Sequence, residues 1–405
     1  MSKSQVPMIL LIFGLFAVPV LTTLNYTSTD TNFLGACLML AVAAAAWLKL
    51  TSQPQQRIYR ISRFQYGFAI AMALVIVGWM IQGIPFWSIQ KSMTYLAALI
   101  LYLTFCRALQ DDHELLRQLV SIKLLVLSAV SVFFILFIYS SAIESASELK
   151  ESPPVFTHLR HLNYELYFGV ILASYSLLSG RKNLLIAVLM SMLVFLTIWS
   201  GGRGSMLAIT AALIYLIVFS RHLPVWRLMA ILAALAIIMM VIIFSSEKQY
   251  LLINTIEYSV TTKPQQFTAG RTIIWLDTIN TVLAKGPAAI LTGLGPDAFR
   301  EYQISPGRVH THNLLSQAFI EFGLIGLAVL TAILARFAIL SIRLCKNSRE
   351  PAHHLAAALF FGGVVFSMFD GIFHHIAPLV MMVLTMAFLQ SASASLAKKP
   401  AIDSS

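Results

Sequence analysis

The sequence predicts an all-α protein that crosses a membrane many times. Three observations indicate this class: 58% of the 405 residues are hydrophobic, only 11% are charged, and the apolar residues occur in long runs. An ordinary soluble domain carries roughly 25% charged residues, and a bilayer-spanning helix needs about 20 mostly apolar residues. These values exclude a soluble enzyme, a disordered chain and a nucleic-acid-binding protein, although the formal net charge is +11.

We expect about twelve membrane-spanning helices. Their approximate ranges are 7–24, 33–50, 65–85, 92–108, 118–140, 161–180, 184–200, 205–220, 227–246, 313–342, 354–373 and 377–396. The first run does not end in a small-residue cleavage pattern, so we expect an uncleaved helix rather than a signal peptide. The chain is thereby divided into helices one to nine in 1–246, a large loop in 247–312, helices ten to twelve in 313–396 and a tail in 397–405.

Positive charges predict the orientation of these helices. If both termini are cytoplasmic, most of the 28 lysines and arginines lie on the cytoplasmic side. This is the side on which short loops of membrane proteins carry an excess of positive charge. Many of the remaining positive residues lie in the loop 247–312, and long loops cross a membrane largely regardless of charge. The large loop is therefore predicted on the opposite, outer side.

The large loop is predicted to be functional and partly helical. Long loops without a function are uncommon inside a compact fold. Apolar residues recur at helical spacing from Arg271 to Leu283, which indicates an amphipathic helix. Gly286-Pro287 should end that helix, and Gly293-Leu294-Gly295-Pro296 predicts a turn.

The segment Ser200-Gly201-Gly202-Arg203-Gly204-Ser205 joins two apolar helices on the outer side. Its glycines allow the backbone to approach a ligand closely. Polar groups at membrane depth are costly and are often functional, so Arg203 is a candidate for binding an anion. The alternative is a tight helical hairpin whose arginine side chain reaches toward water.

A second polar segment, His310-Thr311-His312-Asn313, ends the large loop. Asn313 is a predicted helix N-cap, so His312 precedes a helix N-terminus, where the helix dipole favours an anion. A neutral imidazole at that position could act as a general base. His310 should point the other way, because side chains alternate in an extended segment. The alternative is that both histidines are interfacial loop residues.

The sequence argues against a metal site. His310 and His312 have no evident third ligand nearby, and the three cysteines are too scattered to bind zinc. We expect no cofactor.

Other polar residues in or beside the apolar runs are expected to make structural contacts. They are Glu165, Glu321, Arg336, Asp370, His374 and His375. Arg160 and His161 are exceptions because they lie on the outer face. With His310 and Asn313 they form a secondary set of candidate site residues.

Together these segments resemble the O-antigen ligase family. His312-Asn313, followed by nine residues and then Gly323-Leu-Ile-Gly326, is similar to the family signature His-[Asn/Ser/Gln]-x9-Gly-x-x-[Gly/Thr/Tyr]. The segment from Ser200 to Ser205 resembles the arginine turn that precedes the large periplasmic loop of the family. Gly270-Arg271 with Trp275, and Gly293-Leu-Gly295 with Phe299, resemble the interior of that loop. The resemblance covers about 200–330 in motifs and the remainder in hydropathy.

The resemblance implies a GT-C-type glycosyltransferase with a periplasmic active site in the bacterial inner membrane. It would transfer a polysaccharide from undecaprenyl diphosphate to the lipid A–core oligosaccharide, with inversion at the anomeric carbon and without metal or nucleotide sugar. His312 would be the catalytic residue, and Arg203 and Arg271 would bind the diphosphate. Membrane lipids would surround the protein, and no nucleic acid would bind.

The residue types suit this chemistry. A departing diphosphate gains negative charge, which guanidinium groups can stabilise through bidentate hydrogen bonds. The acceptor hydroxyl must lose its proton as it attacks, and a general base typically contributes about 10²–10⁴-fold to such a rate.

Three other functions remain open. An O-antigen polymerase would use the same donor but extend another lipid-linked glycan. A protein O-oligosaccharyltransferase would glycosylate a serine or threonine, and its relatives usually carry extra C-terminal sequence, so the short tail 397–405 favours the ligase. A transporter of lipid-linked glycan is disfavoured, because the distinctive residues gather on one face whereas transporters bind near the membrane midplane.

Overall fold

The computed structural model describes residues 63–83, 86–109, 123–124, 126–133, 136, 159–178, 184–200, 202–219, 270–305 and 308–398, with single positions in 37–44. The predicted spans 7–24 and 227–246, almost all of 33–50 and about half of 118–140 lie outside the described residues. So do residues 247–269 of the large loop. The described residues form helices and connecting turns without any strand, which confirms an all-α fold.

The long apolar helices that the structure describes overlap the ranges predicted from hydropathy. The described helices are α3 (Arg63–Gln82), α4 (Phe86–Ala108), α7 (Leu159–Leu178), α8 (Leu184–Trp199), α9 (Arg203–Phe219), α13 (Arg271–Ala284), α14 (Pro287–Thr292), α15 (Ala298–Glu301), α16 (Leu314–Asn347), α17 (Pro351–Ser367) and α18 (Ile376–Lys398). The predicted loop helix corresponds to α13, and Gly286-Pro287 separates it from α14 as expected. The short helices α14 and α15 were not predicted.

Two of these helices are long and apolar enough to cross a membrane: α16, and residues Ile376–Ala394 of α18. Shorter apolar helices accompany them, among them α8, α9 and α17. The total of twelve spans and the GT-C arrangement stay predictions.

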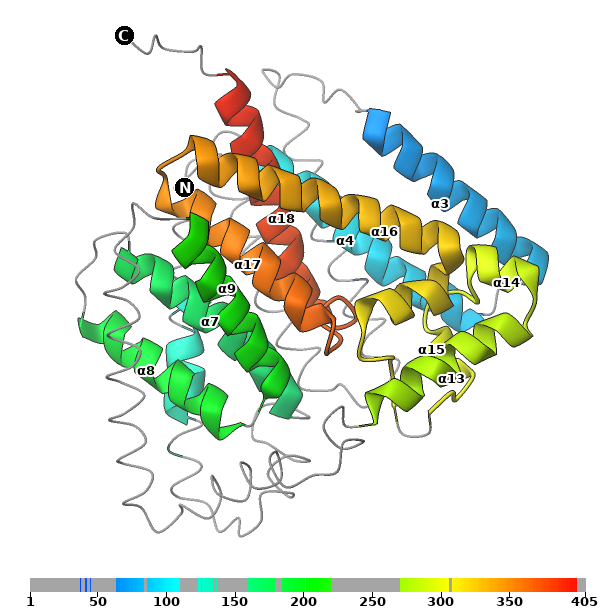
Figure 1. The fold of residues 1–405 in the computed structure, drawn as a ribbon, viewed down its shortest axis with the longest axis horizontal. Helices are drawn as coiled ribbons and strands as arrows, with labels where there is room; N and C mark the ends of the chain where they lie inside the picture. The colour runs from blue at the N-terminus through cyan, green and yellow to red at the C-terminus, as the bar shows by residue number, and fades with distance from the viewer. Residues whose placement is uncertain are drawn as a thin grey trace.

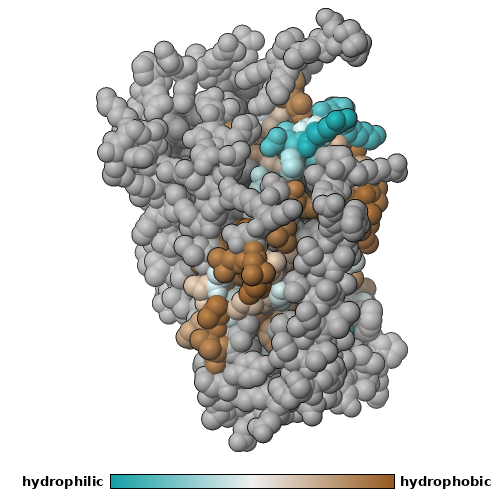
Figure 2. Space-filling model, turned by 90° about the vertical axis from the view of Figure 1, so that its left-hand side faces the viewer, coloured by the Kyte–Doolittle hydropathy of each residue, from teal (hydrophilic) through white to brown (hydrophobic). Residues whose placement is uncertain are grey.

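The core lies around α17, which packs against α7, α9, α16 and α18 (Figure 1). Its centre is aromatic, since Tyr167, Phe168, Phe360 and Phe366 are almost fully buried. In contrast, α3 exposes Leu74 and Ile81, and α8 exposes Leu184. Figure 2 shows hydrophobic surface beside a hydrophilic patch on one face. Exposed apolar helix faces of this kind are typical of helices that contact lipid.

A kink in α16 attaches the large loop to the helical core. Gly323 has φ +63 within α16, so the regular helical hydrogen bonds are interrupted there. The carbonyl groups of Ile320 and Glu321 instead accept hydrogen bonds from the loop amides of Leu294, at 2.7 Å, and Gly295, at 3.1 Å. A Cβ atom on Gly323 would lie only 2.4 Å from the Leu291 backbone. Gly323, a glycine of the signature that resembles the O-antigen ligase family, therefore allows the backbone of α16 to pack directly against the backbone of the large loop.

Candidate active site

The predicted N-cap is present at the start of α16. The side chain of Asn313 accepts hydrogen bonds from the amides of Leu315, at 2.9 Å, and Ser316, at 3.0 Å. Its Nδ2 donates to the carbonyl of Met368 at 3.1 Å, beyond the end of α17. Asn313 thus joins the histidine segment to the loop between α17 and α18.

The histidine segment is a tight turn rather than an extended strand. His312 has φ +55, a left-handed conformation that is uncommon for residues other than glycine. His310 Nδ1 accepts a hydrogen bond from the His312 amide at 3.0 Å, and the two ring centroids are 4.1 Å apart. The prediction that His310 points the other way is therefore wrong, because the positive φ at His312 ends the alternation of an extended chain.

Asp370 is the partner of His312. The Nδ1 atom of His312 lies 3.4 Å from Asp370 Oδ1, which also accepts hydrogen bonds from the hydroxyl of Tyr164 and from the Gly371 amide. Burial opposes ionisation of Asp370, but the Arg160 charge and the His312 hydrogen bond together hold the pKa of this carboxyl well below its usual range. A carboxylate can only accept, so Nδ1 of His312 is the donor and Nε2 carries the lone pair.

The remaining ring nitrogen of His312 suits a base. Nε2 is buried and has no hydrogen-bond partner among the described residues. Burial lowers the pKa of His312, the Asp370 hydrogen bond and charge raise it, and the Arg160 and Arg271 charges lower it, with a net decrease. The imidazole is therefore neutral near pH 7. A hydroxyl that donated to Nε2 would satisfy an otherwise unpaired buried acceptor.

Arginine charges act on this pair, those of Arg160 and Arg271 directly. Arg160 on α7 places its Nε atom 3.5 Å from Asp370 Oδ2. Burial lowers the pKa of Arg271, and the charges that act on it are those of Asp370, Arg160, Arg203 and Arg308. Among the described groups whose charges act on Arg271, three are arginines and one is the Asp370 carboxylate, so the surroundings of Arg271 carry net positive charge. This region is therefore suited to bind an anion with several negative charges.

Local contacts place two of these arginines. Arg271 is the first residue of α13, and one turn later Trp275 Nε1 donates to the Thr311 carbonyl at 3.0 Å. Arg203 is the first residue of α9, after the turn in which Ser200 donates to Asn163 Oδ1 at 2.5 Å. The charges of Arg160 and Arg271 act on His312, and the charge of Arg203 acts on Arg271. The roles predicted for Arg203, Arg271 and His312 stay predictions.

More histidines extend the site than the sequence indicated. His375 Nε2 lies 3.3 Å from His310 Nε2, and the ring centroids of His161 and His375 are 4.9 Å apart. His374 also contacts His310, with centroids 5.0 Å apart. Burial, followed by the charges of neighbouring histidines, lowers the pKa of His310 well below its usual value, so this ring is neutral too.

Asp370 was expected to make a structural contact, and the structure shows that its partners include the candidate base His312. The sequence feature that could have identified Asp370 as a site residue is its ionisable side chain within an apolar region. For two other residues the structural expectation holds: Glu165 forms a buried ion pair with Lys123, and Arg336 donates to Gln390 at 2.8 Å.

The fold also supplies the third ligand that the sequence did not reveal. Ligand atoms of His310, His312 and Asp370 lie within 4.8 Å of one another, which is a spacing compatible with a metal ion. The surrounding arginines nevertheless oppose a divalent cation, because like charges repel strongly where water is excluded.

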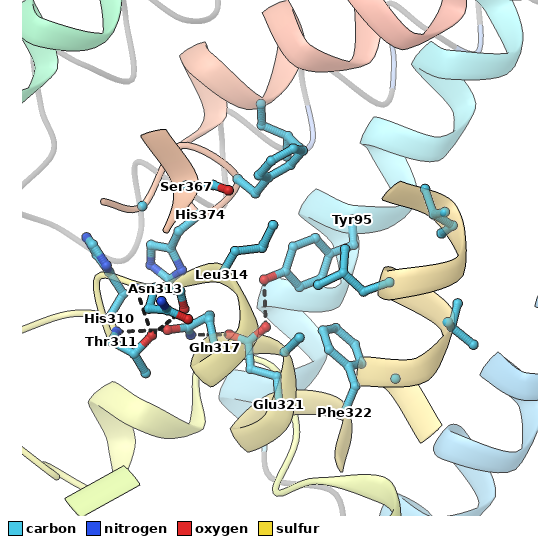
Figure 3. A pocket seen from close by; sticks show the side chains of 18 of the residues that line it. Tyr95, His310, Thr311, Asn313, Leu314, Gln317, Glu321, Phe322, Ser367 and His374 are labelled. Atoms are coloured by element: carbon cyan, nitrogen blue, oxygen red, sulfur yellow. Dashed lines mark hydrogen bonds between the residues drawn. The ribbon is translucent and has the colours of Figure 1, made fainter. Parts of the chain in front are cut away.

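A cavity of about 260 Å³ lies beside the histidine turn, between α4, α16 and the start of α18 (Figure 3). Its polar end contains His310, Asn313, Gln317, Glu321 and His374. Its walls are apolar, and they include residues of α16 beyond the kink: Val329, Leu330 and Ile333.

Residues 185–331 match a family model described as O-Antigen ligase. The match supports a relationship of this region to the O-antigen ligase family. Members of the O-antigen ligase family are membrane-integral, glycosyltransferase-like enzymes that act as ligases or polymerases of lipid-linked polysaccharide. The match includes Arg203, Arg271 and His312, whereas Arg160 and Asp370 lie outside it and reach the site through the fold. Comparison with curated proteins found no match.

Proposed function

We propose that this protein is an O-antigen ligase of the bacterial inner membrane. It transfers a polysaccharide from undecaprenyl diphosphate to the lipid A–core oligosaccharide. The observation that supports this function best is the buried His312–Asp370 pair, with Arg160 in contact with Asp370 and the charge of Arg271 acting on His312. A base beside a positive region is the arrangement required to activate a hydroxyl and to stabilise a departing diphosphate.

The arginines would act on the donor. As the bond between the anomeric carbon and the diphosphate oxygen breaks, both electrons stay with that oxygen. Arg203 and Arg271 would stabilise the resulting charge through bidentate hydrogen bonds. Arg160 would contribute from the other side of Asp370, which it already contacts.

His312 would act on the acceptor. Its Nε2 accepts the hydroxyl proton while the acceptor oxygen forms the new bond to the anomeric carbon. The oxygen attacks from the side opposite the leaving diphosphate, so the configuration at that carbon is inverted. The Asp370 carboxylate stabilises the imidazolium that forms and keeps the ring oriented. The positive charge supplied by the arginines makes a metal ion unnecessary.

The setting of the reaction is part of the proposal. Twelve spans in a GT-C arrangement, with cytoplasmic termini and a periplasmic site, would bring two lipid-anchored substrates together in one membrane plane. Confinement of both reactants favours transfer, because fixed positions replace a chance encounter in solution.

Transfer by the purified protein tests this function. Labelled lipid-linked glycan and core lipid are mixed with the protein in detergent, and a covalent glycan–core product is expected. His312→Ala should lower the rate by about two to four orders of magnitude. The matched control Thr331→Val alters an exposed hydroxyl of α16 and should leave the rate unchanged.

The products distinguish the alternatives. A longer lipid-linked glycan without core product would indicate a polymerase, and a glycosylated peptide would indicate a protein O-oligosaccharyltransferase. Absence of any covalent product in detergent, together with movement of the donor between leaflets when the protein is placed in lipid vesicles, would refute an enzymatic function.

A further inference from the structure

We propose that Glu321 is a positioning residue that orients both the His312 turn and the large loop. The inference rests on the proposed function, in which His312 is the base and Arg271 is a diphosphate ligand. The side chain of Glu321 is 1% exposed, although it belongs to an apolar helix. A buried carboxylate is costly unless it is hydrogen-bonded, so its contacts require explanation.

Glu321 accepts hydrogen bonds from three separate parts of the fold. Tyr95 on α4 donates its hydroxyl to Oε2 at 2.7 Å (Figure 3). Gln317, one turn earlier in α16, donates Nε2 to Oε1 at 2.7 Å. The amide of Asp297, in the large loop, donates to the same Oε1 at 3.0 Å. Carboxyl oxygens have several acceptor positions, so the two oxygens of one side chain satisfy all three donors.

The first branch reaches the histidine turn. Gln317 Oε1 accepts the amide of Thr311 at 2.9 Å, so its carboxamide is fixed at both ends. Thr311 is the residue between His310 and His312, and it is fully buried. The chain from Tyr95 through Glu321 and Gln317 therefore ends at the backbone that orients the base.

The second branch reaches the loop that carries Arg271. Asp297 has φ +68, and its amide is held by Glu321 directly before α15. The backbone carbonyl of Glu321 also accepts the Gly295 amide at 3.1 Å. A single residue thus attaches the loop through both its side chain and its backbone. Separation of the two branches gives the proposal its test.

Two substitutions separate the branches. Gln317→Leu removes only the branch to Thr311, so it should lower kcat by about tenfold to a hundredfold and leave the KM for the donor nearly unchanged. Losses of this size are expected because misplacement of a reacting group by about 1 Å can cost 10²-fold. Glu321→Leu removes both branches and should lower kcat similarly while also raising the donor KM.

The conservative variant Glu321→Gln should rescue most activity. Its carbonyl oxygen can still accept from Gln317 and Asp297, and its amide group can donate to the Tyr95 hydroxyl, which can reverse its role. The double variant Gln317→Leu/Glu321→Leu should have the kcat of Glu321→Leu alone, since both changes break the same chain. Tyr95→Phe leaves both branches in place and should retain most activity.

The pH profile supplies a readout that a general loss of stability does not change. The ionisation of His312 should set the pH below which kcat falls. That pH should shift in Gln317→Leu and Glu321→Leu and stay unchanged in Thr331→Val. The proposal is overturned if Gln317→Leu retains wild-type kcat, or if Glu321→Gln loses as much activity as Glu321→Leu.

The same assay keeps this inference separate from the proposed function. If His312→Ala retains transfer, the proposed function fails. If His312→Ala is inactive while Gln317→Leu and Glu321→Leu remain fully active with unchanged pH profiles, only the role of Glu321 fails. Should Glu321→Leu not fold, Gln317→Leu and Glu321→Gln still decide the outcome.

Discussion

His312 and Asp370 are 58 positions apart in the sequence, but their side chains meet with Nδ1 and Oδ1 3.4 Å apart. Asn313 reinforces this contact, because its side chain caps α16 and also donates to Met368, near Asp370. The start of α16 and the end of α17 are thereby held together around the candidate base.

Activity should depend on pH through His312. The base must be neutral, and burial lowers its pKa below the usual value of about 6.5. Therefore kcat/KM should rise as the pH increases through that lowered pKa and stay level above pH ~7. A bound diphosphate is negative and raises the pKa of a nearby imidazole. The pH below which kcat falls should therefore be higher than the pH below which kcat/KM falls. Asp370→Asn should move the kcat/KM limit to lower pH, and a limit that stays in place would contradict the pairing.

His310 should be more important than an interfacial loop residue. His310→Ala leaves the buried amide of His312 without its acceptor and releases a turn with positive φ. We expect a loss of about tenfold or more, since an unsatisfied buried donor typically costs about 1–3 kcal/mol. His310→Asn should restore much of the rate, because an asparagine side chain can accept from the amide two residues later. Equal rates for the two variants would refute this role.

Lysine should not replace the diphosphate ligands. Arg203→Lys and Arg271→Lys keep the charge but lose the planar pair of donors, so most transfer activity should disappear. Arg308 is exposed and lies in a turn, so Arg308→Lys should have a much smaller effect. Initial rates at several donor concentrations measure all three. If the three variants behaved alike, the phosphate-binding role would have no support.

Removal of divalent cations should have little effect. The arginines already supply positive charge, so saturating EDTA should change the rate by no more than about twofold, or roughly 0.4 kcal/mol in the barrier. Complete inhibition that manganese or magnesium reversed would identify the His310, His312 and Asp370 cluster as a metal site.

Gly323→Ala should detach the large loop from α16. An added Cβ would meet the Leu291 backbone at 2.4 Å, and φ +63 is unfavourable for alanine. We expect a lower melting temperature and a higher KM for the donor, because the loop carries Arg271. Leu324→Ala, at an exposed neighbouring position, is the control. Unchanged donor KM in Gly323→Ala would mean that loop attachment does not position Arg271.

Local sequence patterns were enough to predict the long apolar helices, the loop helix α13, the cap at Asn313 and the family resemblance. These features depend on residues a few positions apart, through hydrophobic periodicity, a capping side chain and glycine spacing. The packing of the helices was needed to show that Asp370 contacts both His312 and Arg160, that His310 accepts a hydrogen bond from the His312 amide, and that Glu321 binds the large loop. Such contacts depend on how α4, α7, α16 and α17 pack, and no local pattern encodes which polar side chains from distant helices will meet. From the sequence alone, Asp370 and Glu321 are expected to make isolated structural contacts, whereas the packed structure shows their hydrogen bonds to the buried site.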